Sequence, residues 1–231
     1  MLRTVFVIMS TFAAFMSYVP IRAFRNAVLA VILSTGALCA KPLVLVAFGD
    51  SLTQGYGLPQ DQGFVPQLQA YLGADNVTVI NAGVSGDTTA GGVSRLDWTL
   101  TPDVDAVIVN LGGNDMLRGL PPSAARANMD KIAATITGRG IPLLIVAMQA
   151  PPNYGAEYKA QFDAIYPDIA TQYGAMITPP YFTPITGGDP DPSKFAEFMQ
   201  ADGIHPNAAG VAKLVAGHGP LIKAFLDQVA K

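Results

Sequence analysis

The chain has 231 residues, with 14 basic and 17 acidic side chains and a formal net charge of −3. Half of the residues are hydrophobic and 13% are charged, which excludes an intrinsically disordered protein. The acidic balance argues against binding to nucleic acid or to an anionic membrane surface through a basic patch. The length suits one domain with a sizeable hydrophobic core.

Residues 1–40 have the composition of an export leader. They contain Arg3, Arg22 and Arg25 but no acidic residue. The apolar stretches 5–19 and 27–40 are each shorter than the roughly 20 residues that span a bilayer. The second stretch follows two arginines and ends in small residues, the layout of a signal peptide cleaved near Ala37–Ala40. The sequence therefore predicts a periplasmic or secreted protein without a stable membrane span, in which residues 41–231 form one domain. An uncleaved membrane anchor is the alternative.

After the leader, short apolar runs alternate with helical patterns. The apolar runs predict strands at residues 43–48, 77–81, 106–111, 142–148 and 175–177. Helices are expected at residues 64–72, 88–100, 123–137, 154–173, 207–216 and 221–229. Strands that are apolar throughout and separated by helices indicate a parallel sheet covered on both faces. The predicted fold is α/β, a three-layer α/β/α sandwich with a mainly parallel five-stranded sheet.

Two details of these helices are also predicted. Ser123 is expected as the N-cap of the helix at 123–137, with Pro167 disturbing the next helix. His218 lies between two glycines, so a solvated turn between the last two helices is expected there.

Polar segments follow the predicted strands. In open parallel sheets, ligands bind at the carboxyl ends of the strands, so side chains in these segments are candidates for chemistry. The segments are residues 49–53, 82–87, 112–115 and, past the last strand, 202–207.

Ser51 and His205 are the candidate nucleophile and base. Ser51 directly follows a buried strand, and a serine hydroxyl reacts only when a base holds its proton. The chain has two histidines, and His205 lies three residues after Asp202 in a turn. This spacing can bring the Asp202 carboxylate to Nδ1 and leave Nε2 free to take a proton. The alternatives are helix capping by Ser51 and by Asp202.

Gly86 and Asn114 are the candidate oxyanion donors. Acyl transfer needs N–H groups aimed at the oxygen that becomes negatively charged. Gly86 can offer its backbone N–H, Asn114 its side-chain amide and Ser51 its own N–H. The alternative for Gly86 and Asn114 is a role in turns.

Signals for other chemistries are missing from the sequence. It has no GxSxG, P-loop, GxGxxG or HExxH motif. The run at residues 189–191 is interpreted as a solvated turn rather than a calcium loop. No metal and no cofactor are predicted.

The four polar segments resemble the signature blocks of the SGNH/GDSL hydrolases: GDSLTQGYG, SGDT, GGND and DGIHPN. The stretches GGNDMLRG, PPNYGAEY and MQADGIHPN are similar to the bacterial periplasmic subgroup of thioesterases, lysophospholipases and arylesterases. The resemblance implies a flavodoxin-like sheet and a Ser51–His205–Asp202 triad. It also implies an oxyanion hole made by Ser51, Gly86 and Asn114, and hydrolysis of acyl esters and thioesters of small molecules or lipids.

Apolar side chains border this predicted site. They are Met116, Leu117 and Leu120 after the third strand, and Pro152 and Tyr154 after the fourth. These five residues predict a groove for an acyl chain; packing of the first three as core is the alternative. An O-deacetylase of carbohydrates or cell walls, an acyltransferase, and a catalytically idle binding protein are the alternative functions.

Overall fold

The computed structural model describes residues 41–74, 77–188 and 195–231. Residues Pro42–Lys231 form one compact unit. The predicted leader and the turn at residues 189–191 lie outside the described residues. Within the described part of the chain, no helix is both long enough and apolar enough to cross a bilayer.

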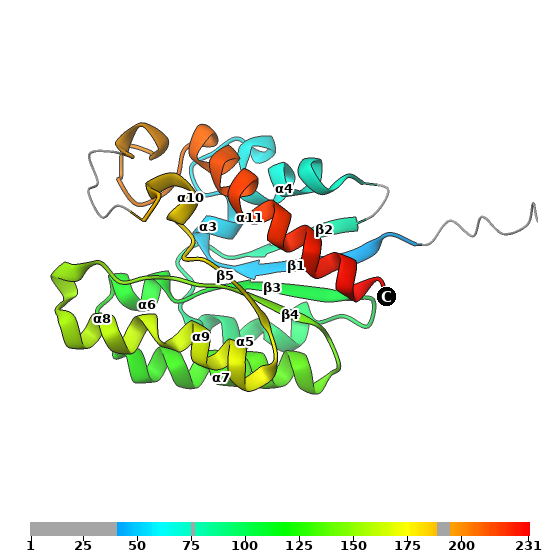
Figure 1. Ribbon diagram of the computed structural model, residues 1–231, viewed down its shortest axis with the longest axis horizontal. Coiled ribbons are helices and arrows are strands. Elements are labelled where there is room, and N and C mark those ends of the chain that lie inside the picture. Colours follow the sequence, from blue (N-terminus) through cyan, green and yellow to red (C-terminus); the bar gives the residue numbers. More distant parts are fainter. Residues whose placement is uncertain (1–40, 75–76, 189–194) are drawn as a thin grey trace, which may run out of the picture. The chain divides into compact units, whose positions relative to one another are not determined.

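The centre of this unit is a sheet of five parallel strands in the order β2-β1-β3-β4-β5 (Figure 1). The strands are β1 (Leu43–Gly49), β2 (Val77–Gly83), β3 (Ala106–Asn110), β4 (Leu143–Val146) and β5 (Met176–Thr178). β3 and β4 are buried throughout, as expected for strands covered on both faces. This is the flavodoxin-like strand order. The chain adds β2 on one side of β1 and the later strands on the other side, so the switch point of the sheet lies between β1 and β3. The predicted fold class is confirmed.

Helices cover both faces of the sheet (Figure 1). One face carries α4 (Phe64–Leu72) and α11 (Ala208–Val229), which contact each other. The other face carries α5 (Thr89–Thr99), α7 (Pro122–Gly138), α8 (Ala156–Asp163) and α9 (Ile165–Tyr173). The remaining elements are short: α3 (Ser51–Gln54), η2 (Gln60–Gln62), α6 (Gly113–Leu117), η3 (Pro152–Tyr154), α10 (Thr183–Thr186) and η5 (Ala196–Phe198).

The C-terminal segment is one helix, so the prediction of two helices separated by a turn at His218 was wrong. The two glycines that suggested a break allow close packing instead. A Cβ on Gly217 would lie 2.4 Å from Pro184, and one on Gly219 would lie 2.6 Å from the Tyr71 ring. His218 is therefore 2% exposed, and its Nε2 donates a hydrogen bond to the Tyr181 carbonyl at 2.8 Å.

The start of α7 also differs from the prediction. The helix begins at Pro122, and Ser123 lies in its first turn rather than at the N-cap. Proline suits this first position because the helix requires no N–H bond there. The expected disturbance near Pro167 is present, because α8 ends at Asp163 and α9 begins at Ile165.

Candidate active site

Ser51 lies at the carboxyl end of β1, where the strand turns into α3. Asp50 is the N-cap of this helix, and its Oδ1 accepts a hydrogen bond from the Leu52 N–H at 3.0 Å. Gly49 permits the tight turn, since a Cβ there would lie 2.1 Å from Thr53 Oγ1. The local sequence thus holds Ser51 in the first turn of a helix above the switch point of the sheet.

His205 connects Ser51 to Asp202. Its Nε2 lies 2.8 Å from Ser51 Oγ, and its Nδ1 lies 2.7 Å from Asp202 Oδ2. The structure therefore brings together the three residues that the sequence singled out, across 154 positions of the chain. This is the geometry in which an imidazole can take the serine proton from one side while a carboxylate fixes its orientation from the other.

The Asp202 carboxylate is fixed by its own loop. Its Oδ1 accepts hydrogen bonds from the N–H groups of Ile204 at 2.9 Å and His205 at 3.0 Å. Partial desolvation raises the pKa of Asp202, but these bonds and the contact with the His205 ring outweigh it and lower the pKa from 3.8 to about 2. Asp202 is therefore ionised at neutral pH and able to orient an imidazolium.

Gly86 and Asn114 follow β2 and β3, the two strands that pair with β1. Gly86 follows β2 and has a φ of 82°, a conformation that favours glycine. Its carbonyl accepts a hydrogen bond from Arg118 Nη2 at 2.7 Å, which joins the loop after β2 to the end of α6. Asn114 lies in the first turn of α6 after β3. Both predicted oxyanion donors thus lie at the carboxyl edge of the sheet with Ser51.

Asp50 is a residue of the site that sequence reasoning missed. Its side chain is 2% exposed, and its Oδ2 accepts a hydrogen bond from Asn114 Nδ2 at 3.3 Å. Burial raises the pKa of Asp50 from 3.8 to about 6, although the Leu52 N–H, a positive charge on His205 and the Asn114 amide all lower it. Its place in the polar segment 49–53, between a buried strand and a helix start, was the signal that the sequence offered.

Tyr56 and Gln200 also contact the loops of the site and were not predicted. The ring of Tyr56 packs on the ring of His205, with 4.7 Å between centroids. Gln200 Nε2 donates hydrogen bonds to the carbonyls of Tyr56 at 2.8 Å and Pro206 at 3.0 Å. These contacts join the loop after α3 to the loop that carries His205.

The five predicted groove residues differ in their surroundings. Met116 is 9% exposed and belongs to the hydrophobic core, as the alternative interpretation expected. Leu117 is 48% exposed and Leu120 is 37% exposed. Pro152 is exposed, and the ring of Tyr154 packs on that of Tyr158, whose hydroxyl donates to the Leu120 carbonyl at 3.0 Å. The loop after α6 and the segment after β4 are therefore in contact.

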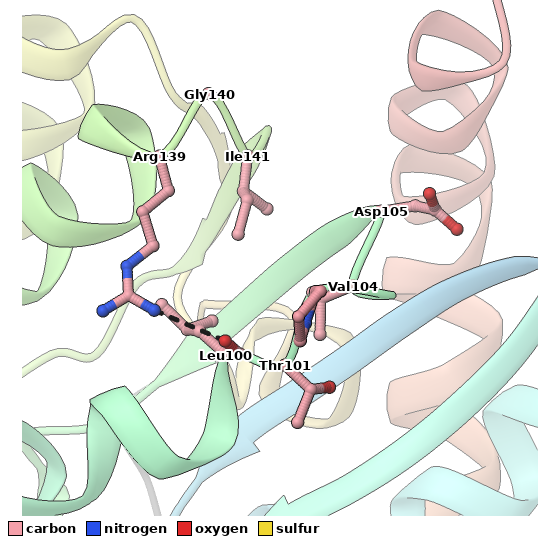
Figure 2. A pocket seen from close by; sticks show the side chains of 8 residues that line it. Leu100, Thr101, Val104, Asp105, Arg139, Gly140 and Ile141 are labelled. Atoms are coloured by element: carbon pink, nitrogen blue, oxygen red, sulfur yellow. Dashed lines mark hydrogen bonds between the residues drawn. The ribbon is translucent and has the colours of Figure 1, made fainter.

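A hollow at the opposite edge of the sheet, near the start of β3 and β4, is unrelated to these residues (Figure 2). Asp105, at its border, accepts a hydrogen bond from the Val44 N–H at 2.8 Å, and Arg139 donates one to the Leu100 carbonyl at 3.3 Å. Neither at this hollow nor elsewhere do the described residues contain a group of three or more His, Cys, Asp or Glu side chains placed to hold a metal ion.

Comparisons with curated proteins give several similar enzymes. The chain is 37% identical over 201 residues to Esterase TesA of Pseudomonas aeruginosa, covering 86% of this chain and 96% of that protein. It is 37% identical over 168 residues to the Arylesterase of Vibrio mimicus, covering 70% and 79%. It is 33% identical over 178 residues to Thioesterase 1/protease 1/lysophospholipase L1 of Escherichia coli, covering 77% and 81%.

Solved structures and a family model agree with these matches. The crystal structure of TesA superposes with a TM-score of 0.70 at 35% identity, covering 79% of this chain and 99% of that one. AlinE4, an SGNH-hydrolase family esterase, superposes with a TM-score of 0.64 at 41% identity, covering 80% and 97%. The model of the GDSL-like lipase/acylhydrolase family matches residues 47–213. The chain therefore belongs to the GDSL-like lipase/acylhydrolase family and is an ester hydrolase.

Proposed function

We propose that this ester hydrolase cleaves acyl esters and thioesters through a covalent acyl-enzyme, with Ser51 as nucleophile, His205 as base and Asp202 as the residue that orients His205. The observation that carries the proposal is the hydrogen-bonded chain from Ser51 Oγ through both ring nitrogens of His205 to Asp202, with distances of 2.8 and 2.7 Å. Relatives named esterase, arylesterase and thioesterase support the choice of substrates.

In the first half of the reaction, Ser51 Oγ attacks the acyl carbonyl carbon and its proton moves to His205 Nε2. The carbonyl oxygen becomes an oxyanion, which the N–H groups of Ser51 and Gly86 and the amide of Asn114 stabilise. When the intermediate collapses, the bond to the alcohol or thiol breaks and the leaving group takes the proton from His205. Water then repeats these steps on the acyl-enzyme and releases the acid.

Two substitutions test the assignment of the nucleophile and the base. Ser51→Ala and His205→Ala are each expected to lower kcat by about 10⁴–10⁶-fold, and the double variant by little more, because the two groups act as a unit. An organophosphate should label the peptide that contains Ser51 and leave Ser51→Ala unlabelled. Retention of a tenth of the wild-type kcat by His205→Ala would refute its role as base.

The exposed side chains near Asn114 support a preference for medium-length acyl chains. Leu117 and Leu120 offer apolar surface beside the proposed oxyanion hole, with Pro152 and Tyr154 on the adjoining segment; Met116 supports this loop from the core. Burial of each further CH₂ group contributes about 0.8 kcal/mol, or roughly fourfold in kcat/KM if the gain persists in the transition state.

A series of 4-nitrophenyl esters from acetyl to dodecanoyl, run beside acyl-CoA thioesters, measures this preference. We expect kcat/KM to rise from acetyl to the medium chains, and Leu117→Asp to flatten the rise because its carboxylate cannot be buried against the chain. A steady fall from acetyl onward, together with release of acetate from acetylated xylan, would favour a deacetylase.

Export of the protein to the periplasm or the medium is the proposed location. The basis is the arginine-containing apolar segment that precedes Lys41, with cleavage near Ala37–Ala40. Fractionation of expressing cells followed by N-terminal sequencing of the active enzyme tests it. Activity confined to the cytosol, with the N-terminal segment retained, would contradict export.

A further inference from the structure

The proposed role of Asn114 demands a particular orientation of its amide group. The nitrogen can donate to an oxyanion, whereas the oxygen would repel it. The two ends of an amide have almost the same shape, so packing alone does not decide which end faces the substrate. A neighbouring group that accepts but cannot donate a hydrogen bond does decide, because it attracts the nitrogen.

Asp50 is such a neighbour. Its Oδ2 accepts from Asn114 Nδ2 at 3.3 Å, and its Oδ1 is occupied by the Leu52 N–H at 3.0 Å. Since the carboxylate is 2% exposed, water cannot easily take its place. One hydrogen of Nδ2 thus points to Asp50, and the second hydrogen stays available for the substrate oxygen.

We propose that Asp50 is a positioning residue, whose carboxylate holds the Asn114 amide with its N–H toward the acyl oxygen. This inference rests on the proposed oxyanion role of Asn114. The carboxylate does not touch the substrate; it acts through Asn114.

Helix capping alone does not explain an aspartate at this position. Asparagine caps a helix about as well as aspartate. A buried carboxylate is also unfavourable for the fold, since burial raises the pKa of Asp50 to about 6. Asparagine would avoid that penalty, but its NH₂ group could donate to Asn114 Oδ1 and so select the orientation that faces the oxyanion with oxygen. The carboxylate is therefore suited to the orientation of Asn114 rather than to stability.

The charge of Asp50 could instead act on His205, whose positive charge it attracts. A double-mutant cycle separates the two routes. If Asp50 acts through Asn114, then Asp50→Asn should cause no further loss of kcat in the Asn114→Ala background. If Asp50 acts through the charge of His205, the losses from the two substitutions add.

The experiment compares full-length wild type, Asp50→Asn, Asn114→Ala and the double variant for kcat, KM and thermal denaturation at about pH 8. We expect Asp50→Asn to lower kcat by about 10²-fold with little change in KM, as for the loss of an oxyanion donor. The double variant should be within about twofold of Asn114→Ala, because the effects are not independent. Asp50→Asn should denature at a temperature no lower than wild type, whereas a merely structural role predicts a lower one.

Asp105→Asn is the matched control. Asp105 also accepts a hydrogen bond from a backbone N–H, that of Val44, but at the opposite edge of the sheet (Figure 2). Its substitution should leave kcat unchanged. If Asp50→Asn does not fold, Asp50→Ser provides the test, since serine keeps a capping oxygen for Leu52 and removes the contact with Asn114.

The outcomes distinguish this inference from the proposed function. Wild-type kcat in Asp50→Asn, or additive losses in the double variant, would overturn the positioning role while leaving the oxyanion hole intact. Wild-type kcat in Asn114→Ala would instead refute Asn114 as an oxyanion donor, and the positioning role would fall with it.

Discussion

The ring of Tyr56 gives His205 a neighbour on the side that Ser51 and Asp202 leave open. The two rings lie 4.7 Å apart with an angle of 40° between their planes, and about half of the Tyr56 side chain is exposed. Such ring pairs contribute about 0.5–1.5 kcal/mol beyond the area they bury. Tyr56 therefore restricts the movement of the imidazole without a hydrogen bond to it.

We expect Tyr56→Ala to lower kcat by about three- to tenfold, since the imidazole then leaves its productive orientation more often. Tyr56→Phe keeps the ring and should retain nearly full activity, so steady-state kinetics of the two variants form a matched pair. Equal losses in both would point to the hydroxyl instead of the ring contact.

At this scale the sequence pointed to the groups proposed to react, but not to the side chains that contact them. Ser51, His205 and Asp202 follow from short-range patterns, because two histidines left one plausible base and the aspartate lies three residues away. Asp50 and Tyr56 gain their meaning only from contacts with Asn114 and His205, which are distant in the chain. No local pattern encodes such contacts.

At the scale of elements, Gln200 joins the segments that carry the proposed nucleophile and the proposed base. Its side chain donates to the carbonyls of Tyr56 and Pro206, and its backbone N–H donates to the His205 carbonyl at 2.8 Å. A Cβ on Gly57 would lie 2.2 Å from Gln200 Oε1, so the turn after α3 packs closely on this side chain. The distance between Ser51 and His205 therefore depends on a residue that touches neither side chain.

Gln200→Ala is expected to lower kcat by about tenfold or more. It removes the hydrogen bond to Tyr56, which joins the two loops, and the hydrogen bond to Pro206 within the loop of His205, so the loops can separate. Gln200→Glu keeps the length of the side chain but cannot donate, so it should lose a similar factor. Rates of Ser51 labelling by an organophosphate should fall in parallel. An unchanged labelling rate in both variants would contradict the positioning role.

Element boundaries were less predictable than the elements themselves. The apolar runs located all five strands. The three inner strands, β1, β3 and β4, are almost entirely buried, whereas the edge strands β2 and β5 are only partly buried. The glycines around His218 led to the wrong prediction of a turn, since glycine occurs both where a helix breaks and where a continuous helix packs closely on a neighbour. Only the positions of Pro184 and Tyr71, outside that helix, distinguish the two cases.

For the molecule as a whole, two buried groups give folding stability opposite dependences on pH. His218 is buried and its pKa is lowered by desolvation, despite its hydrogen bond to the Tyr181 carbonyl. The folded state therefore binds fewer protons at this site, and its contribution to stability is lost as pH falls below the unfolded value of 6.5. Asp50 has a raised pKa, so its contribution is present below 3.8 and lost as pH rises through about 6.

The raised pKa of Asp50 lowers the free energy of unfolding by about 3 kcal/mol at neutral pH, where the buried carboxylate is charged, since one pKa unit equals about 1.4 kcal/mol. Asp50→Asn should remove this opposing effect, so its denaturation temperature should fall more steeply than that of wild type between about pH 6 and pH 4. Adding His218→Gln, which takes no proton, should flatten the fall. A slope unaffected by His218→Gln would mean that other groups cause acid unfolding.

The separation of 154 positions between Ser51 and His205 should also determine when activity appears as the chain folds. The sheet and most of its helices are complete before His205 in the chain, yet the proposed nucleophile has no base until the segment leading into α11 has docked. Contacts between such distant residues form late because a long loop must close first. On refolding from denaturant, we expect turnover of a chromogenic ester to lag behind recovery of the far-UV circular dichroism. The hydrolase would then remain inactive until its last helix has packed on the sheet, so the appearance of activity would mark the completion of folding.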